Sequence, residues 1–131
     1  MLDITNLTRT KISTDFLQKV ARAAFAVLGL KDDNVSLVLV GEKKIKELNE
    51  KYRGKNKVTD VLSFEDLDEI FICLPRAKRQ AKLLKTPLKS ELTRLFVHGI
   101  VHLKGYDHER SKTAELEMRK IEEKILARIW N

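Results

Sequence analysis

Residues 97–108 read Val97-His98-Gly99-Ile100-Val101-His102-Leu103-Lys104-Gly105-Tyr106-Asp107-His108, and they hold all three histidines of the 131-residue chain. His98 and His102 are four residues apart, so on a helix their side chains lie on one face, one turn from each other. Gly105 predicts the end of that helix, because glycine readily adopts the positive φ found at helix C-termini. The chain can turn there and bring His108 back toward the other two histidines.

Three imidazoles around one point, with a fourth position open, are typical of catalytic zinc, whereas structural zinc sites are usually closed by four ligands. A lone histidine is more often a surface or core residue, and a pair at this spacing can arise by chance on any helix. Here all three histidines fall in one short stretch, which favours metal binding by His98, His102 and His108. The sequence therefore predicts one Zn²⁺ held by three histidines and a water, with Ni²⁺ or another divalent metal left open by ligand type.

A metal at this site would lower the pKa of a bound water to about 7 and so supply hydroxide at neutral pH. With a phosphodiester, either this hydroxide attacks phosphorus, or the metal polarises a phosphate oxygen while a ribose 2′-hydroxyl attacks. The sequence leaves both routes open. The position at which H-E-x-x-H metalloproteases carry a general-base glutamate is Gly99. A peptidase of that kind is therefore disfavoured.

The histidine stretch, H-G-x-x-H-L-x-G-Y-D-H, resembles the signature of the YbeY family of bacterial rRNA maturation factors. A second block, residues 48–55 followed by residues 59–64, is similar to the family's L-N-x-x-Y-R…T-D-V-L-S-F segment. The two blocks come in the family's order. With the elements around them, the resemblance covers nearly the whole chain.

This resemblance implies a single YbeY-like metallohydrolase domain over residues 1–131. The implied function is that of a zinc-dependent, single-strand-specific endoribonuclease in rRNA processing, namely 3′-end maturation of the small-subunit (16S) rRNA, and in ribosome quality control. The implied partners are RNA, including rRNA in ribosomal subunits, and ribosomal or ribosome-associated proteins. The implied location is the cytoplasm.

The resemblance also places Arg53 at the position of the family's catalytic arginine. A guanidinium suits this role, because its planar fork matches the oxygens of a phosphate on which charge builds. The alternative for Arg53 is a surface arginine at a helix end. Asp107 can fix an imidazole tautomer or act as a turn or cap residue, and Ser63 can face the cleft or be an ordinary strand residue.

Composition is in accord with a polyanionic partner. The formal net charge is +7 and the pI is near 9.6. Basic residues without an intervening acid run through residues 51–57 and 76–89, which favours RNA over the alternative of a solvated, lysine-rich surface. No run is long enough for a transmembrane helix, the first residues lack the layout of a signal peptide, and the one cysteine forms no internal disulfide. These features predict a cytoplasmic protein without membrane attachment.

Hydrophobic periodicity predicts an α+β fold, with a small mixed sheet of about four strands packed with several helices. Strands are expected at residues 1–5, 35–40, 61–64 and 70–74, and helices at about 13–28, 43–51, 76–84, 88–104 and 111–130. The helix at 88–104 should be buried over most of its circumference, with Glu91, His98 and His102 sharing the remaining face. Gly99 lies in its apolar stripe and should let another element approach closely.

Two other classes of function compete with the endoribonuclease. A ribosome assembly or quality-control factor would act mainly by binding, so that the basic stretches carry its function. A metallohydrolase of peptides or small molecules would use the same ligands, but the basic surface and the glycine at position 99 argue against it.

Overall fold

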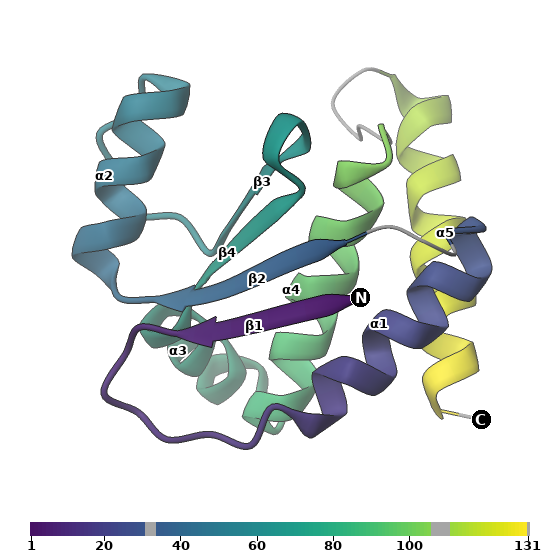
Figure 1. Cartoon of the computed structure of the whole chain (residues 1–131), viewed down its shortest axis with the longest axis horizontal. Coiled ribbons are helices and arrows are strands. Elements are labelled where there is room, and N and C mark those ends of the chain that lie inside the picture. Colours follow the sequence, from purple (N-terminus) through teal and green to yellow (C-terminus); the bar gives the residue numbers. More distant parts are fainter. Residues whose placement is uncertain (31–33, 106–110, 131) are drawn as a thin grey trace.

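The computed structural model describes residues 1–30, 34–105 and 111–130. These residues form a sheet of four strands together with five α-helices and one 3₁₀ turn (Figure 1). The strands are β1 (Leu2–Asn6), β2 (Val35–Val40), β3 (Val61–Phe64) and β4 (Glu69–Cys73), and the 3₁₀ turn is η1 (Glu65–Leu67). The helices are α1 (Asp15–Leu28), α2 (Glu42–Arg53), α3 (Leu74–Leu84), α4 (Leu88–Leu103) and α5 (Lys112–Trp130).

The sheet is mixed, as the sequence predicts. Its strand order is β1-β2-β4-β3, in which β2 is parallel to both β1 and β4, and β3 runs antiparallel to β4. The parallel pairs need crossovers of their own, and α1 lies within the segment that joins β1 to β2. The antiparallel pair is joined by η1 alone, which ends at Asp68 with a φ of 50°. Strand β3 therefore lies at the edge of the sheet, where it contacts α4, the helix that carries His98 and His102.

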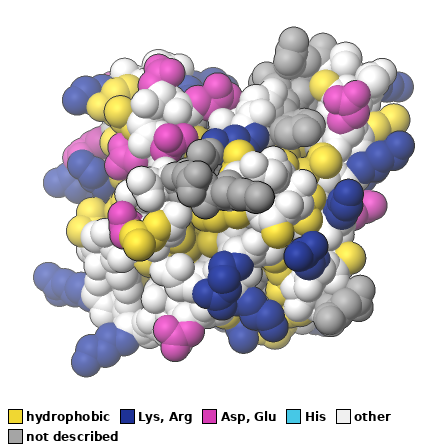
Figure 2. Space-filling view, turned by 45° about the vertical axis from the view of Figure 1, so that its right-hand side comes forward, with side chains coloured by type: hydrophobic (Ala, Val, Ile, Leu, Met, Phe, Trp, Pro, Cys, Tyr) yellow, Lys and Arg dark blue, Asp and Glu magenta, His cyan; other side chains and the backbone are white. Residues whose placement is uncertain are grey.

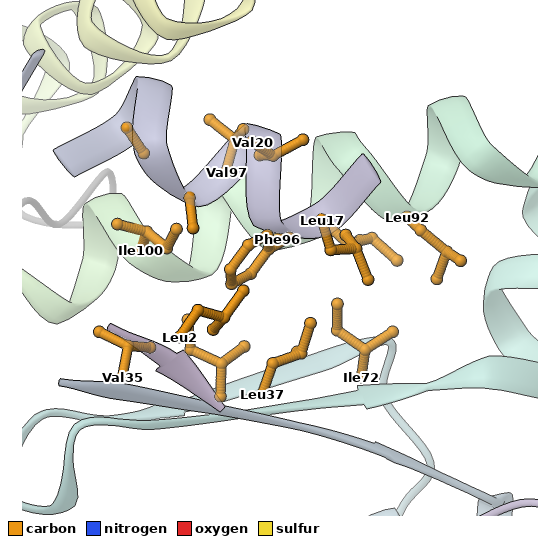
Figure 3. Packing of buried hydrophobic residues seen from close by; sticks show 14 of the residues in the cluster. Leu2, Leu17, Val20, Val35, Leu37, Ile72, Leu92, Phe96, Val97 and Ile100 are labelled. Atoms are coloured by element: carbon orange, nitrogen blue, oxygen red, sulfur yellow. The ribbon is translucent and has the colours of Figure 1, made fainter. Parts of the chain in front are cut away.

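Helix α4 lies at the centre of the fold and packs against α1, α3, α5 and the strands β3 and β4. Figure 3 shows Phe96 of α4 in the layer between α1 and the sheet, facing Leu37 and Ile72 of the strands. Phe96, Leu37 and Ile72 are fully buried. Because close-packed side chains tolerate little displacement, a helix buried on most sides is a rigid support for the polar groups on its remaining face.

Gly99 is the point at which α4 comes closest to the sheet. A Cβ atom at this position would lie 2.9 Å from Cγ2 of Ile70 and 3.3 Å from Oγ of Ser63. At a separation below 3.0 Å one of the two groups must shift, and Ile70 is fully buried, so it has little room to move. The prediction that Gly99 permits a close approach is therefore confirmed.

The observed helix ends differ from the expected ones by a few residues. Helix α2 extends to Arg53 and is capped by Gly54 with a φ of 68°, whereas the sequence predicts its end near residue 51. Among the described residues, no helix has the length and apolar content needed to span a membrane.

Candidate active site

The structure brings His98 and His102 together on the exposed face of α4. Their ring centroids are 4.9 Å apart and the ring planes are tilted by 74°. The His98 side chain is 30% exposed, whereas its neighbours in the sequence, Val97 and Gly99, are buried. Both imidazoles therefore reach a common surface from a helix whose other faces are largely buried.

The remaining predicted ligand, His108, lies outside the described residues, and so do Tyr106 and Asp107. Within residues 1–30, 34–105 and 111–130 no group of three or more His, Cys, Asp or Glu side chains is arranged to hold a metal ion. Two imidazoles one turn apart nevertheless fit the donor set that zinc prefers.

Helix α5 contributes a carboxylate to the histidine face. Oε1 of Glu122 lies 2.7 Å from Nδ1 of His98. An ionised carboxylate can only accept a hydrogen bond, so Nδ1 is the donor and Nε2 is the nitrogen suited to a metal. Metal-binding histidines commonly donate their other ring N–H to a carboxylate in this way. His98 therefore fits the part of a metal ligand in its surroundings as well as in its spacing.

A cleft of about 280 Å³ joins the histidine face to the opposite wall of the molecule. Three cations of the α2–β3 segment lie on that wall, with polar and apolar residues of β3 and the preceding loop between them and the histidines. The lining residues are Asn49, Arg53, Lys55, Lys57, Thr59, Asp60, Val61, Leu62, Ser63, His98 and His102. The structure thus places the predicted arginine, Arg53, in the same cleft as the two histidines.

The position of Arg53 is linked to α4 through Ser63. Nη2 of Arg53 donates to the backbone oxygen of Ser63 at 2.8 Å, and the guanidinium carbon lies 5.8 Å from the centroid of the Phe64 ring. The hydroxyl of Ser63 in turn donates to the backbone oxygen of Gly99 at 3.2 Å. A guanidinium has five N–H donors, so this anchoring is compatible with binding a phosphate.

Two further lining residues stabilise the basic loop, which is formed by residues 54–60 between α2 and β3. Nδ2 of Asn49, which is 3% exposed, donates to the backbone oxygen of Lys57 at 3.0 Å. Asp60 accepts hydrogen bonds from the backbone N–H of Val61 at 2.8 Å and from Nε2 of Gln80 at 3.3 Å. These bonds hold the backbone at Lys57 and at Val61 in a fixed path toward β3.

One to two turns before His98, α4 carries an ion pair between the buried Glu91 and the exposed Arg94. Glu91 is 2% exposed and accepts hydrogen bonds from Nε and Nη2 of Arg94 at 2.9 and 2.6 Å. The pKa of the Arg94 guanidinium is raised, first by this hydrogen bond and further by the charges of Glu91, Asp60 and Glu122. The face of α4 that carries the histidines thus continues as a line of polar groups, and the pair with Arg94 was not predicted from the sequence.

The side of the molecule formed by α1 and α5 carries a second cavity. Figure 2 views the molecule with the side of α1 and α5 turned forward, where Lys and Arg side chains are spread over the surface and no histidine of the described residues is visible. A separate cavity of about 580 Å³ lies between α1 and the start of α4 and is lined by Phe16, Lys19, Arg22 and Lys89 among others. It is larger than the histidine cleft but lacks its ligands and its arginine.

The chain as a whole is similar to proteins of a known family. The model of the family described as "Endoribonuclease YbeY" matches residues 3–130. The "Endoribonuclease YbeY" of Aquifex aeolicus is 38% identical, with 96% of this chain and 90% of that protein aligned. The protein of the same name from Thermodesulfovibrio yellowstonii is 46% identical over 72% of this chain and 66% of its own length. Among solved structures, the solution structure of TM1509 from Thermotoga maritima is similar, with a TM-score of 0.66, 29% identity and coverage of 98% of this chain and 91% of that one.

Proposed function

The chain belongs to the YbeY family, and on that premise we propose that it is a metal-dependent endoribonuclease that cuts single-stranded RNA during rRNA processing and ribosome quality control in the cytoplasm. The observation that carries this proposal is the cleft in which Arg53, Lys55 and Lys57 face His98 and His102. Ribosomal subunits, their 16S rRNA and their proteins are the partners that the proposal implies.

The cationic wall of the cleft is suited to an RNA backbone. Lys55 and Lys57 attract phosphates as point charges, and each contact releases counterions from the RNA. Arg53 can bind two oxygens of one phosphate with its planar fork, because its anchoring bond to Ser63 uses only Nη2. We assign Arg53 the stabilisation of charge on the phosphate that is cut.

The opposite wall is suited to a metal. His98 and His102, together with His108, would hold one Zn²⁺ or a similar divalent ion. When bound, such a metal supplies an activated water near neutral pH. The glutamate that serves as base in H-E-x-x-H peptidases has no counterpart, because position 99 is a glycine packed closely against Ile70. The lack of this base argues against a peptidase of that kind.

The proposal is tested by cleavage of a precursor rRNA fragment that carries the 3′ end of the small-subunit RNA. Wild type, His102→Ala, Arg53→Ala and the control Arg128→Ala, an exposed residue in the last turn of α5, are purified identically. We expect cutting by wild type and by the control. Loss of a donor to the transition state typically lowers the rate about 10²–10³-fold, and we expect at least this loss for Arg53→Ala.

The zinc content of the variants tests the assignment of His102 as a metal ligand independently of RNA cleavage. His102→Ala should no longer retain zinc after dialysis, whereas Arg53→Ala should retain it. Full zinc occupancy in His102→Ala would contradict the assignment of that residue. Equal cutting by all four proteins would indicate a contaminating nuclease and would leave the binding-factor alternative as the better explanation.

A further inference from the structure

Glu122 is the one charged residue in the apolar seam of α5 formed by Met118, Ile125 and Ile129. These three residues are buried, and a helix places position 122 on the same side as 118, 125 and 129. A carboxylate at the edge of a core is unfavourable unless it has a hydrogen-bond partner. The partner is Nδ1 of His98, 24 residues away in the sequence.

We propose that Glu122 is a positioning residue for His98, which holds the imidazole in the Nδ1–H tautomer and thereby presents Nε2 to the metal. This inference rests on the proposed function only in taking His98 as a metal ligand. Glu122 touches neither the metal nor the RNA in this assignment and acts through the histidine alone.

The hydrogen bond between His98 and Glu122 favours the Nδ1–H tautomer of the imidazole. The distance of 2.7 Å between Nδ1 and Oε1 is that of a short, charge-assisted hydrogen bond. The other neutral tautomer would set the lone pair of Nδ1 against a carboxylate oxygen, which is repulsive. The His98 and Glu122 side chains are 30% and 24% exposed, so the bond is only partly screened by water.

The packing of α5 makes this bond a consequence of the fold. Helix α5 contacts α1 and α4, and its seam residues Met118, Ile125 and Ile129 belong to the main hydrophobic cluster. The same contacts that stabilise the fold therefore fix the carboxylate beside His98. Helix α5 acts as a part of the metal site and not only as a cover for the core.

The test compares Glu122→Ala with Glu123→Ala. Glu123 is the adjacent, exposed carboxylate of the same helix, so the two variants remove equal charge. Zinc affinity is measured with Zn²⁺ alone, in competition with a chromophoric chelator. Loss of a carboxylate that orients a metal-binding histidine typically weakens metal binding about 10–100-fold. We expect this loss for Glu122→Ala and wild-type affinity for Glu123→Ala.

The tautomer is read separately, from the ¹⁵N signals of the histidine rings in the metal-free protein above the usual titration range of histidine. We expect the Nδ1–H form for His98 in wild type and in Glu123→Ala, and a shift toward the Nε2–H form in Glu122→Ala. A tautomer and a zinc affinity in Glu122→Ala equal to those of Glu123→Ala would overturn the inference.

The conservative variant Glu122→Gln covers the case in which the alanine variant fails to fold. Its amide oxygen can still accept from Nδ1, so it should restore the Nδ1–H tautomer and most of the zinc affinity. A well-folded glutamine variant that restores neither would also overturn the positioning role. Neither measurement uses RNA, so a wild-type protein that cuts no RNA would refute the proposed function and leave this inference standing.

Discussion

Replacing Arg94 by leucine should destabilise the protein by about 2–4 kcal/mol at pH 7, because it leaves the carboxylate of Glu91 buried without its partner. Glu91 is 2% exposed and accepts two hydrogen bonds from this arginine, at 2.9 and 2.6 Å. Arg94 itself is 52% exposed, so its replacement removes little packing. The loss should come almost entirely from the orphaned carboxylate.

The size of this loss follows from the burial of the two partners. Removing one partner of a fully buried ion pair typically costs about 3–5 kcal/mol, because the other charge is left uncompensated. The Arg94 side chain is 52% exposed, so water can partly take the place of its guanidinium beside Glu91. The expected loss is therefore somewhat smaller, about 2–4 kcal/mol.

The assay is urea unfolding at pH 7, followed by circular dichroism. The double variant Glu91→Gln/Arg94→Leu has no charge to bury and should be more stable than Arg94→Leu. The matched control is Arg79→Leu. Arg79 is 54% exposed and pairs with Glu42 at 2.8 Å, but Glu42 is 44% exposed, so no measurable loss is expected. A loss in Arg94→Leu no larger than that in Arg79→Leu, or a double variant no more stable than Arg94→Leu, would refute the reasoning.

Three further outcomes are expected. Gly99→Val should lower the free energy of unfolding by about 2–3 kcal/mol, because its side chain collides with Ile70; thermal unfolding at the wild-type temperature would contradict the close approach. Cys73 should react with a thiol reagent only on unfolding, because burial raises the pKa of its thiol and so reduces the thiolate at any given pH; rapid labelling of the native protein would disprove this. Asn49→Ala should cost about 1–2 kcal/mol by removing the hydrogen bond to Lys57, and faster proteolysis of the basic loop would report the same loss.

The elements of the fold could be predicted because each has a local signature. Alternation and apolar runs mark the strands, and the helical spacing of apolar residues marks α1, α4 and α5. The sheet order β1-β2-β4-β3 has no such signature, since it depends on pairings between distant segments. Helix ends depend on caps such as Gly54, so the periodicity of apolar residues places them only to within a few residues.

The same distinction applies to the candidate site: features within one helix could be predicted from the sequence, and contacts between elements could not. The pairing of His98 with His102 follows from a spacing of four on one helix, and the buried role of Gly99 from its place in the apolar stripe. The meeting of Arg53 with the histidines was expected only through the family resemblance, because the contact joins two elements that periodicity does not place. For Glu122, the sequence offers an acid at an apolar position of α5, but its partner depends on how α5 packs against α4.

One chain of contacts connects the stability of the core to the chemistry of the cleft. Gly99 lets β3 approach α4, the Ser63 hydroxyl then donates to the backbone of Gly99, and the Ser63 carbonyl accepts from Arg53. The spacing between the guanidinium and the histidines is therefore set by a packed contact between α4 and β3, and not by the loop that carries Lys55 and Lys57. A side chain at position 99 should push Ser63 and Arg53 away from the histidines together. Because small displacements of catalytic groups lower rates steeply, Gly99→Ala should lose more activity than its loss of stability would suggest.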